Sequence, residues 1–283
     1  MDSIYERLPH AEPDELFAPD VGAWGRQKNM RLWNYLGIFT TGMKTSYEMR
    51  VYVDLFAGSG KNRIKKTNEW LLGSPLLALS VRDQFDRLIF CEKDAVKADT
   101  LKIRASRMRT ENVYVLNLDA NEDVSDVERL IPYRGALTFC FVDPYDIGFN
   151  FNQLVRLTKS RRMDVLILLA VQMDARRNLE IYRREENQKI SRMLGRDDWR
   201  DDWSAAETSG VPFGRWFRNA FTASMEGIGY VRPKDADIQT IKLRDVGNVG
   251  LYDLAFYSKH ERGYDFWRKA VKGATDQTSL LLD

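Results

Sequence analysis

The chain has 283 residues, and its 44% of hydrophobic residues are ample for the core of one large α/β domain with an insertion. The formal net charge is only +2, so any contact with nucleic acid has to come from a local basic patch and not from the overall charge. Two cysteines, Cys91 and Cys140, and two histidines, His10 and His260, are scattered along the chain, which argues against a metal site and against histidine-based acid–base catalysis.

Residues 1–45 are predicted to form an extended arm followed by a helix. Three of the eight prolines and several acids fall within residues 1–22, as is typical of an extended segment, and no apolar core of a signal peptide is present. Apolar residues then recur at helical spacing from Trp24 to about Gly42. The longest apolar run, Val165–Val171, is too short to span a bilayer, so we expect a cytoplasmic protein that makes no membrane contact.

Residues 46–172 are predicted to form the first part of a core in which strands and helices alternate. Five apolar runs, RVYVD, RLIFCE, NVYVLNLD, ALTFCFVD and MDVLILLAV, predict strands, and helical segments separate them. Ser74 and Pro75 are predicted as the N-cap and first residue of one helix, whereas the polar stretch 61–70 is expected to be a loop. Apolar strands that alternate with helices indicate a parallel sheet covered on both faces.

The alternation stops after Gln172. Residues 173–230 hold no convincing strand and are rich in Arg, Asp and Trp, so they are predicted to form a helical insertion. Its tryptophans fit core packing better than a base-stacking platform, and its paired arginines fit a solvated surface. Residues 231–283 return to the core, with a hairpin around Gly247–Asn248 and a helix over about Gly263–Val271.

Four consecutive predicted strands end in an acid. In an open parallel sheet, ligands bind at the carboxyl ends of the strands, near the point where the strand order reverses. Each acid taken alone is equally consistent with a helix cap. All four together predict a ligand site at one edge of the sheet. These acids are Asp54, Glu92, Asp119 and Asp143.

A glycine-rich turn follows the first of these strands. Gly58 and Gly60 allow positive φ and a close approach of the backbone to a ligand. The third glycine of the dinucleotide fingerprint is replaced by Arg63, which disfavours a nicotinamide enzyme, and a P-loop is excluded because no G-K-[ST] sequence is present.

A nucleotide with a ribose fits the remaining acids. Glu92 suits two adjacent ribose hydroxyls, because a carboxylate can accept two hydrogen bonds. Asp119 suits an adenine amino group, which needs an acceptor. Asp143 is then left to face the substrate.

The motifs VDLFAGSG, FCEKD, LDAN and FVDPY together resemble the class I S-adenosylmethionine-dependent methyltransferases over about Arg50–Ala170. More narrowly, DLFAGSG…GSPLLAL, the DPY-x-x-G strand end and the block LAFYSKHERGYDFW resemble the three-Cys-motif partner proteins over most of the chain. The resemblance implies a Rossmann-like methyltransferase fold, with a mostly parallel sheet of about seven strands, helices on both faces and an antiparallel last strand. It also implies S-adenosylmethionine as cofactor and a partner protein with a radical-type three-cysteine motif.

Motif matching assigns residues to the parts of this cofactor. The glycine turn would hold the methionine end, the second strand end the ribose and the third strand end the adenine. The residues so implied are Asp54, Phe56, Gly58 and Gly60, then Glu92, then Asp119 and Ala120.

The DPY sequence lies where amino-methyltransferases carry D-P-P-Y, and one proline is missing. In the full motif the Asp side chain and the first Pro carbonyl accept hydrogen bonds from the target amino group, and the aromatic ring stacks on the flipped base. Asp143, the Pro144 carbonyl and Tyr145 supply the same three groups. The alternative is that Tyr145 packs under the following helix and Asp143 caps that helix.

The sequence thus predicts an S-adenosylmethionine-dependent methyltransferase acting on an amino group of a nucleic-acid base or nucleotide. One alternative is a methyltransferase for a protein or small molecule. Another is a non-catalytic or regulatory partner subunit that works with a three-cysteine-motif protein. Four basic residues directly after the glycine turn are the predicted phosphate contacts: Lys61, Arg63, Lys65 and Lys66.

Overall fold

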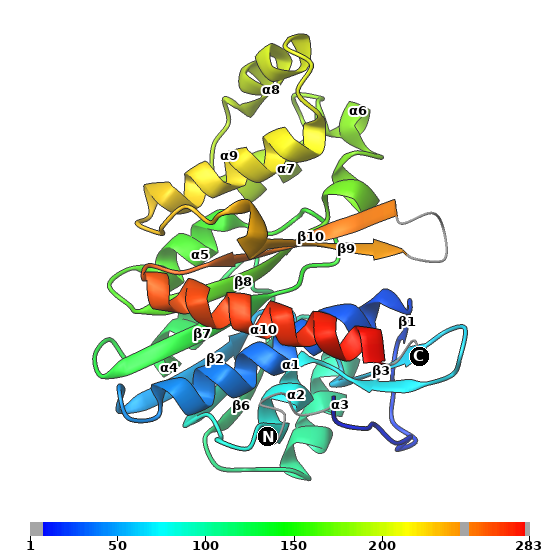
Figure 1. The fold of residues 1–283 in the computed structure, drawn as a ribbon, viewed down its shortest axis with the longest axis vertical. Helices are drawn as coiled ribbons and strands as arrows, with labels where there is room; N and C mark the ends of the chain where they lie inside the picture. The colour runs from blue at the N-terminus through cyan, green and yellow to red at the C-terminus, as the bar shows by residue number, and fades with distance from the viewer. Residues whose placement is uncertain (1–7, 244–248, 281–283) are drawn as a thin grey trace.

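The computed structural model describes residues 8–243 and 249–280, and a seven-stranded sheet forms its centre (Figure 1). The strands are β2 (Met49–Asp54), β5 (Arg87–Glu92), β6 (Val113–Asn117), β7 (Ala136–Val142), β8 (Met163–Leu169), β9 (Ile238–Leu243) and β10 (Val249–Tyr257). Their order is β6-β5-β2-β7-β8-β10-β9, and β10 runs antiparallel to both of its neighbours. The predicted α/β fold with a mostly parallel sheet is confirmed.

The strand order reverses at β2. From this central strand the chain first moves outward through β5 to β6, and then returns to add β7 and β8 on the other side. All residues of β7 and β8 are buried, which explains why their sequences are apolar apart from Thr138 and Asp164. The carboxyl ends of β2, β5 and β7 therefore lie next to one another at the reversal point.

Helices cover both faces of the sheet. Along one face, α1 contacts both α10 and α2, and α2 contacts α3; α1 and α10 lie side by side in Figure 1. On the other face, α4 contacts α5, and α5 contacts a helix of the segment that follows β8. The bounds are α1 (Trp24–Met43), α2 (Ser74–Ser80), α3 (Ala95–Ser106), α4 (Ser125–Leu130), α5 (Phe151–Thr158) and α10 (Glu261–Leu280).

Aromatic packing fixes α1 against the sheet. The Tyr35 ring of α1 lies 4.7 Å from the ring of Phe139 on β7 and 5.0 Å from the ring of Phe256 on β10. Trp267 of α10 stacks on Phe256 at 5.5 Å. These side chains are all fully buried, so α1 has a defined position above the strands that carry the site.

The segment between β8 and β9 forms a helical projection at the top of Figure 1. Trp199, Trp203 and Trp216 are buried there, and Trp203 packs edge-on against Phe213 at 5.1 Å. The tryptophans thus pack against one another and present no stacking surface. The elements are the π-helix η1 (Val171–Ala175), α6 (Leu179–Tyr182), α7 (Lys189–Leu194), α8 (Trp199–Thr208), α9 (Phe213–Gly227) and the 3₁₀-helix η2 (Asp235–Asp237).

A small second sheet corrects the loop expected over residues 61–70. It has the order β1-β3-β4, with β1 (Asp20–Val21), β3 (Lys61–Ile64) and β4 (Trp70–Leu72). β3 pairs with the arm on one side and with β4 on the other. β3 is mostly polar and β4 has only three residues, so neither carries an alternating apolar pattern that would predict a hairpin.

Three boundaries also differ from expectation. Gly73, not Ser74, is the N-cap of α2, because the Ser74 hydroxyl is used by Asp54. β6 ends at Asn117, two residues before Asp119. α10 extends well beyond the predicted end at Val271. The turn predicted at Gly247–Asn248 lies outside the described residues.

The two cysteines are free and buried, and β2 separates the strands β5 and β7 that carry them. Burial raises the pKa of both thiols. Among the residues that the structure describes, no helix is both long enough and apolar enough to cross a bilayer.

Candidate functional site

The four acids all lie at the carboxyl edge of the sheet. Asp54 and Glu92 are the last residues of β2 and β5, which are neighbours. Asp143 directly follows β7, the neighbour of β2 on the other side. Asp119 lies two residues beyond β6, the outermost strand. The reversal of strand order thus brings Asp54, Glu92 and Asp143 to adjacent strand ends.

The glycine turn needs both of its glycines, for different reasons. Gly58 has φ +65°, and a Cβ built there would meet no atom within 4 Å, so the space in front of it is open to a ligand. Gly60 has φ +88°, and a Cβ there would come within 2.9 Å of the Leu101 side chain. Gly60 therefore serves the packing of the turn, and Gly58 faces the site.

Glu92 is tied to the glycine turn by its carboxylate. Oε2 accepts a hydrogen bond from the Gly58 N–H at 2.8 Å, and Oε1 accepts one from the Asp94 N–H at 2.9 Å. A carboxylate offers about four acceptor positions, so each oxygen of Glu92 retains one. The orientation of Glu92 is thus fixed, while two hydroxyl groups can still donate to it.

Asp119 is held by one exposed cation. Its carboxylate pairs with the Lys93 ammonium at 2.6 Å and accepts a hydrogen bond from the Asn121 N–H at 3.0 Å. Burial alone would raise the pKa of Asp119, but these two partners hold it below its usual value. The Lys93 side chain is 75% exposed, so an incoming amino group can displace it. Ala120 is buried directly beside this carboxylate.

Asp54 lies beneath the glycine turn and does not line the cavity there. It is fully buried, and it accepts hydrogen bonds from the Tyr52 hydroxyl at 3.1 Å and the Phe56 N–H at 3.2 Å. Burial raises the pKa of Asp54 to about 7, the Ser74 hydroxyl opposes this rise, and the charge of Asp143 adds to it. Asp54 therefore organises the turn from below.

This raised pKa predicts a pH-dependent stability difference between the wild type and Asp54→Asn. Because the folded-state pKa of Asp54 is raised to about 7, the folded protein binds more protons than the unfolded chain between about pH 4 and 7. The contribution of Asp54 is thus complete below about pH 4 and is lost as the pH rises through 7. Urea unfolding should show Asp54→Asn gaining about 1.4 kcal/mol per pH unit over the wild type between about pH 5 and 7. A constant difference across that range would contradict a raised pKa.

The DPY segment presents its tyrosine to solvent. Tyr145 is fully exposed, whereas Pro144 before it and Ile147 after it are buried. The N-cap of α5 is Asn150, whose side chain accepts a hydrogen bond from the Asn152 N–H. The alternative in which Tyr145 packs under α5 and Asp143 caps it is therefore wrong.

A cavity of ≈ 180 Å³ joins the glycine turn to the DPY segment. Its lining includes Phe56, Gly58, Ser74 and Asp143, together with Trp24 and Lys28 of α1. Lys28 forms an ion pair with Asp143. Sequence reasoning assigned no role to α1, and a single lysine in a helix carries no signal that points to a site.

The insertion holds the DPY loop in place. The Ile147 N–H donates to Asp174 Oδ2 at 3.0 Å, and Asp174 Oδ1 accepts from the Tyr182 hydroxyl at 2.6 Å. Asp146 forms an ion pair with Lys189 of α7. Asp174, which lies in the π-helix after β8, was also missed by sequence reasoning because its contacts are long-range.

Two of the four predicted phosphate contacts are engaged with acids of the arm. Lys61 pairs with Asp14 at 3.0 Å, and Arg63 pairs with Asp20 at 2.7 Å. Lys65 and Lys66 are exposed in the turn between β3 and β4. Lys61 and Arg63 thus bind the arm, whereas Lys65 and Lys66 point to the surface.

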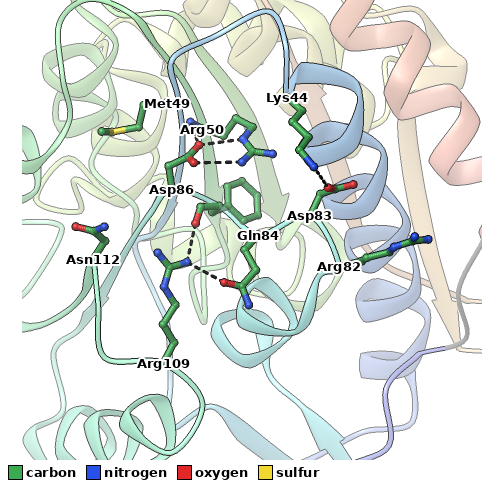
Figure 2. A pocket seen from close by; sticks show the side chains of 10 residues that line it. Lys44, Met49, Arg50, Arg82, Asp83, Gln84, Asp86, Arg109 and Asn112 are labelled. Atoms are coloured by element: carbon green, nitrogen blue, oxygen red, sulfur yellow. Dashed lines mark hydrogen bonds and ion pairs between the residues drawn. The ribbon is translucent and has the colours of Figure 1, made fainter.

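A larger hollow of ≈ 450 Å³ lies at the opposite edge of the sheet, beside the amino ends of β2 and β5 (Figure 2). Its cations bond mainly to neighbouring residues of the hollow, as Figure 2 shows. Lys44 pairs with Asp83 at 2.7 Å, and Arg50 pairs with Asp86 at 2.9 Å. Arg109 donates to the Phe85 carbonyl at 2.7 Å. This hollow holds none of the predicted site residues.

Comparisons with known proteins find resemblance at the level of structure. No family model and no curated protein matches the sequence. Protein LPL1258 from Legionella pneumophila is 12% identical, with a TM-score of 0.47 over 84% of this chain and 85% of that one. TYW2 from M. jannaschii, in complex with AdoMet, is 13% identical, with a TM-score of 0.40 over 85% of this chain and 78% of that one.

The N-methyltransferase NodS from Bradyrhizobium japonicum is 7% identical, with a TM-score of 0.42 over 83% of this chain and 97% of that one. Resemblance this distant transfers neither an activity nor a substrate to this chain. The function therefore has to be argued from the site itself.

Proposed function

We propose that this chain is an S-adenosylmethionine-dependent methyltransferase that transfers a methyl group to an exocyclic amino group of a nucleic-acid base or nucleotide. The observation that carries the proposal is the cavity that Gly58 and Asp143 line together. A cofactor turn and an acceptor carboxylate share one space there. Methyl transfer needs that juxtaposition, because donor and acceptor atoms must lie in near-contact before they react.

The residues present fit this cofactor. The open space in front of Gly58 admits a ligand against the backbone, and Glu92 retains one acceptor position on each oxygen for a ribose. Asp119 offers a carboxylate to an adenine amino group. The cavity of ≈ 180 Å³ suits only part of such a ligand, since complete small-molecule sites enclose about 300–1,000 Å³. We assign it to the methyl-bearing end, with ribose and adenine along the open edge.

The acceptor side is built from the DPY segment. When bound, S-adenosylmethionine supplies an electrophilic methyl group on a positively charged sulfur. Asp143 and the Pro144 carbonyl orient the amino group, whose nitrogen bonds to the methyl carbon as the carbon–sulfur bond breaks and then releases a proton. A neutral amino group needs no strong base, which fits a site without histidine. The exposed Tyr145 ring provides the stacking surface for the base.

Binding of the cofactor is tested by calorimetry on the wild type and on Glu92→Ala. The wild type should bind S-adenosylmethionine in the micromolar range. Glu92→Ala should lose roughly 2–3 kcal/mol of binding free energy, because two hydrogen bonds to ribose hydroxyls disappear. Glu111→Ala, which changes an exposed glutamate before β6, serves as the matched control and should bind normally. Well-folded wild-type protein that binds neither this cofactor nor its demethylated product would rule out the proposal.

The sequence resemblance to the three-Cys-motif partner proteins leads us to propose a protein partner as well. A three-cysteine-motif protein is the implied partner, and a non-catalytic role beside it is the alternative to methyl transfer. Cofactor binding without methylation of any acceptor would favour that alternative.

A further inference from the structure

A second cavity lies at the amino ends of β7 and β8, at the edge of the sheet opposite the proposed methyl-transfer site. It encloses ≈ 190 Å³, and its lining comes from the end of α1, the start of α10 and the first residues of the two strands. The two helices contact each other and lie side by side over this part of the sheet (Figure 1). A cavity of about 150 Å³ is known to hold a benzene ring, so this one has room for a single ring with small substituents.

The walls of this cavity are apolar. Phe39 and Met43 near the end of α1 and Leu137 of β7 are buried, and Phe266 of α10 completes the wall. Burial of an apolar ring against such side chains is favourable, because it removes apolar surface from water. The walls therefore favour a ligand with an apolar body.

A buried carboxylate without a cationic partner lines the same cavity. Asp164 of β8 is 7% exposed, and its Oδ2 accepts a hydrogen bond from the Tyr35 hydroxyl at 3.1 Å. Within the described ranges, no Lys, Arg or His forms an ion pair with Asp164. A carboxylate offers about four acceptor positions, so Asp164 can still accept hydrogen bonds from a ligand.

The surroundings of Asp164 make a cationic partner favourable. Burial raises the pKa of Asp164 to about 6, while the hydroxyls of Ser258 and Tyr35 and the neighbouring His260 oppose this rise. Asp164 is therefore mainly ionised at neutral pH despite its burial. A buried charge is costly until it is paired, so an amino group that entered the cavity would gain a strong partner there.

Two arginines that line the cavity carry the opposite charge. Arg162 directly precedes β8, and its guanidinium lies 5.8 Å from the centre of the Tyr47 ring. Arg262 lies in the first turn of α10, with its guanidinium 5.6 Å from the centre of the Phe266 ring. Both arginines are exposed, and in the part of the chain that the structure describes neither guanidinium pairs with an acid. A guanidinium stacked on a ring keeps its N–H groups available for a carboxylate.

The strand geometry separates the two kinds of charge. Arg162 and Asp164 are two residues apart, so they project from the same face of the strand, about 6.6 Å apart along it. The hydrogen bond from Tyr35 of α1 shows that this face is the one that α1 covers. Arg162 lies nearer the edge of the sheet, and Asp164 lies deeper. A ligand that reaches both needs an amino group and an anionic group at opposite ends of a short apolar body.

We propose that this cavity binds a small zwitterion, whose amino group pairs with Asp164, whose ring packs between α1 and α10, and whose carboxylate pairs with Arg162 and Arg262. The reverse orientation is disfavoured, because it would place like charges against each other at both ends. The inference does not depend on the proposed methyltransferase function, since it rests on residues at the other edge of the sheet.

The test is a titration with three probes, followed through the histidine ring signals by nuclear magnetic resonance. 4-(Aminomethyl)benzoate carries both charged groups, whereas benzylamine lacks the carboxylate and benzoate lacks the amino group. The chain has two histidines: His260 lines the cavity, and the His10 side chain is 78% exposed in the arm. The signals of His260 should shift with 4-(aminomethyl)benzoate and those of His10 should not. The zwitterion should bind at least about 10-fold more tightly than either of the other probes.

Substitutions separate the two ends of the ligand. Asp164→Asn should weaken binding of the zwitterion and of benzylamine by about 10-fold or more and should not weaken benzoate. Arg162→Met and Arg262→Met should each weaken the zwitterion and benzoate by about 3- to 10-fold and leave benzylamine unchanged. Arg134→Met is the matched control, because Arg134 is exposed just before β7 and does not line the cavity. It should bind all three probes as the wild type does.

Three results would overturn the inference. The first is the absence of any His260 shift with 4-(aminomethyl)benzoate at about 10 mM. The second is equal affinity for the three probes, and the third is unchanged binding of the zwitterion in Asp164→Asn or in both arginine variants. The thermal stability of Asp164→Asn is measured alongside and should not fall, since the change removes a buried charge that has no ion-pair partner. Failure to bind S-adenosylmethionine would remove the proposed function and leave this inference unaffected.

Discussion

Asp143→Ala is expected to lower methyl transfer by about 100-fold or more, the size of effect seen when a preorganised polar contact to a reacting group is removed. Cofactor affinity should stay within a few-fold of the wild type, because Glu92 and the glycine turn carry the proposed cofactor contacts and Asp143 lies on the far side of β2 from Glu92. Single-turnover transfer and calorimetry measure the two quantities separately. Asp126→Ala, which removes an exposed ion pair with Arg129 on α4, is the control and should leave both quantities unchanged.

Two outcomes would contradict this role of Asp143. Loss of cofactor binding in Asp143→Ala would make the carboxylate a cofactor contact. Unchanged methylation would mean that the shortened DPY sequence does not work as D-P-P-Y does. The thermal stability of Asp143→Ala is measured as well, because the change leaves the partly buried Lys28 without its partner and a loss of folding would also lower methyl transfer.

Arg104→Ala is expected to destabilise the fold by about 3–5 kcal/mol, because it leaves three carbonyl groups without their donor and leaves the partly buried Asp14 carboxylate paired with Lys61 alone. The Arg104 side chain is 2% exposed and donates to both oxygens of Asp14, at 2.8 and 2.7 Å. It also donates to the carbonyls of Leu16, at 3.2 Å, of Phe17, at 2.9 Å, and of Ser59 in the glycine turn, at 2.7 Å. One guanidinium thus joins the arm, α3 and the glycine turn. Urea unfolding gives the size of the loss.

Arg107→Ala at the end of the same helix should change stability little, because Arg107 is exposed. The hydrogen bond from Arg104 holds the pKa of Asp14 well below its usual value, with burial opposing and Lys61 assisting. The stabilisation that ionised Asp14 contributes is present above about pH 4 and is lost as the pH falls towards its folded-state pKa. The difference in unfolding free energy between the wild type and Arg104→Ala should therefore become smaller in acid. If Arg104→Ala lowered the free energy of unfolding by less than about 1 kcal/mol at neutral pH, the Arg104–Asp14 ion pair would be no stronger than an ordinary surface ion pair, and this prediction would be wrong.

The edge of the sheet that carries the site is predictable from the sequence, because strand ends in a parallel sheet obey a topological rule. The acids after the first, second and fourth strand patterns are close in space only because the chain reverses direction at β2. The glycine turn is equally predictable from the sequence, because positive φ at Gly58 and Gly60 restricts the residue type there. The strand-end acids follow from a topological rule and the glycine turn from a local backbone requirement, and both kinds of constraint can be recognised in a sequence.

The rest of the site depends on packing between distant segments. Lys28 reaches Asp143 across 115 residues of chain, and no local pattern distinguishes it from other lysines of an exposed helix end. Asp174 binds the DPY loop from the π-helix by a long-range contact of the same kind. Ser74 matches the rule for an N-cap, yet its hydroxyl serves the buried Asp54 instead. A tertiary hydrogen bond to a buried carboxylate outweighs a capping bond available to water.

The most direct test of the account is the transfer of labelled methyl groups from S-adenosylmethionine to pooled RNA, DNA, nucleotides and protein, with Asp143→Ala run in parallel. The account predicts label in nucleic acid or nucleotide, recovered on an exocyclic amino nitrogen after digestion, and almost none with Asp143→Ala. Protein that binds the cofactor but labels no nucleic acid or nucleotide would contradict it.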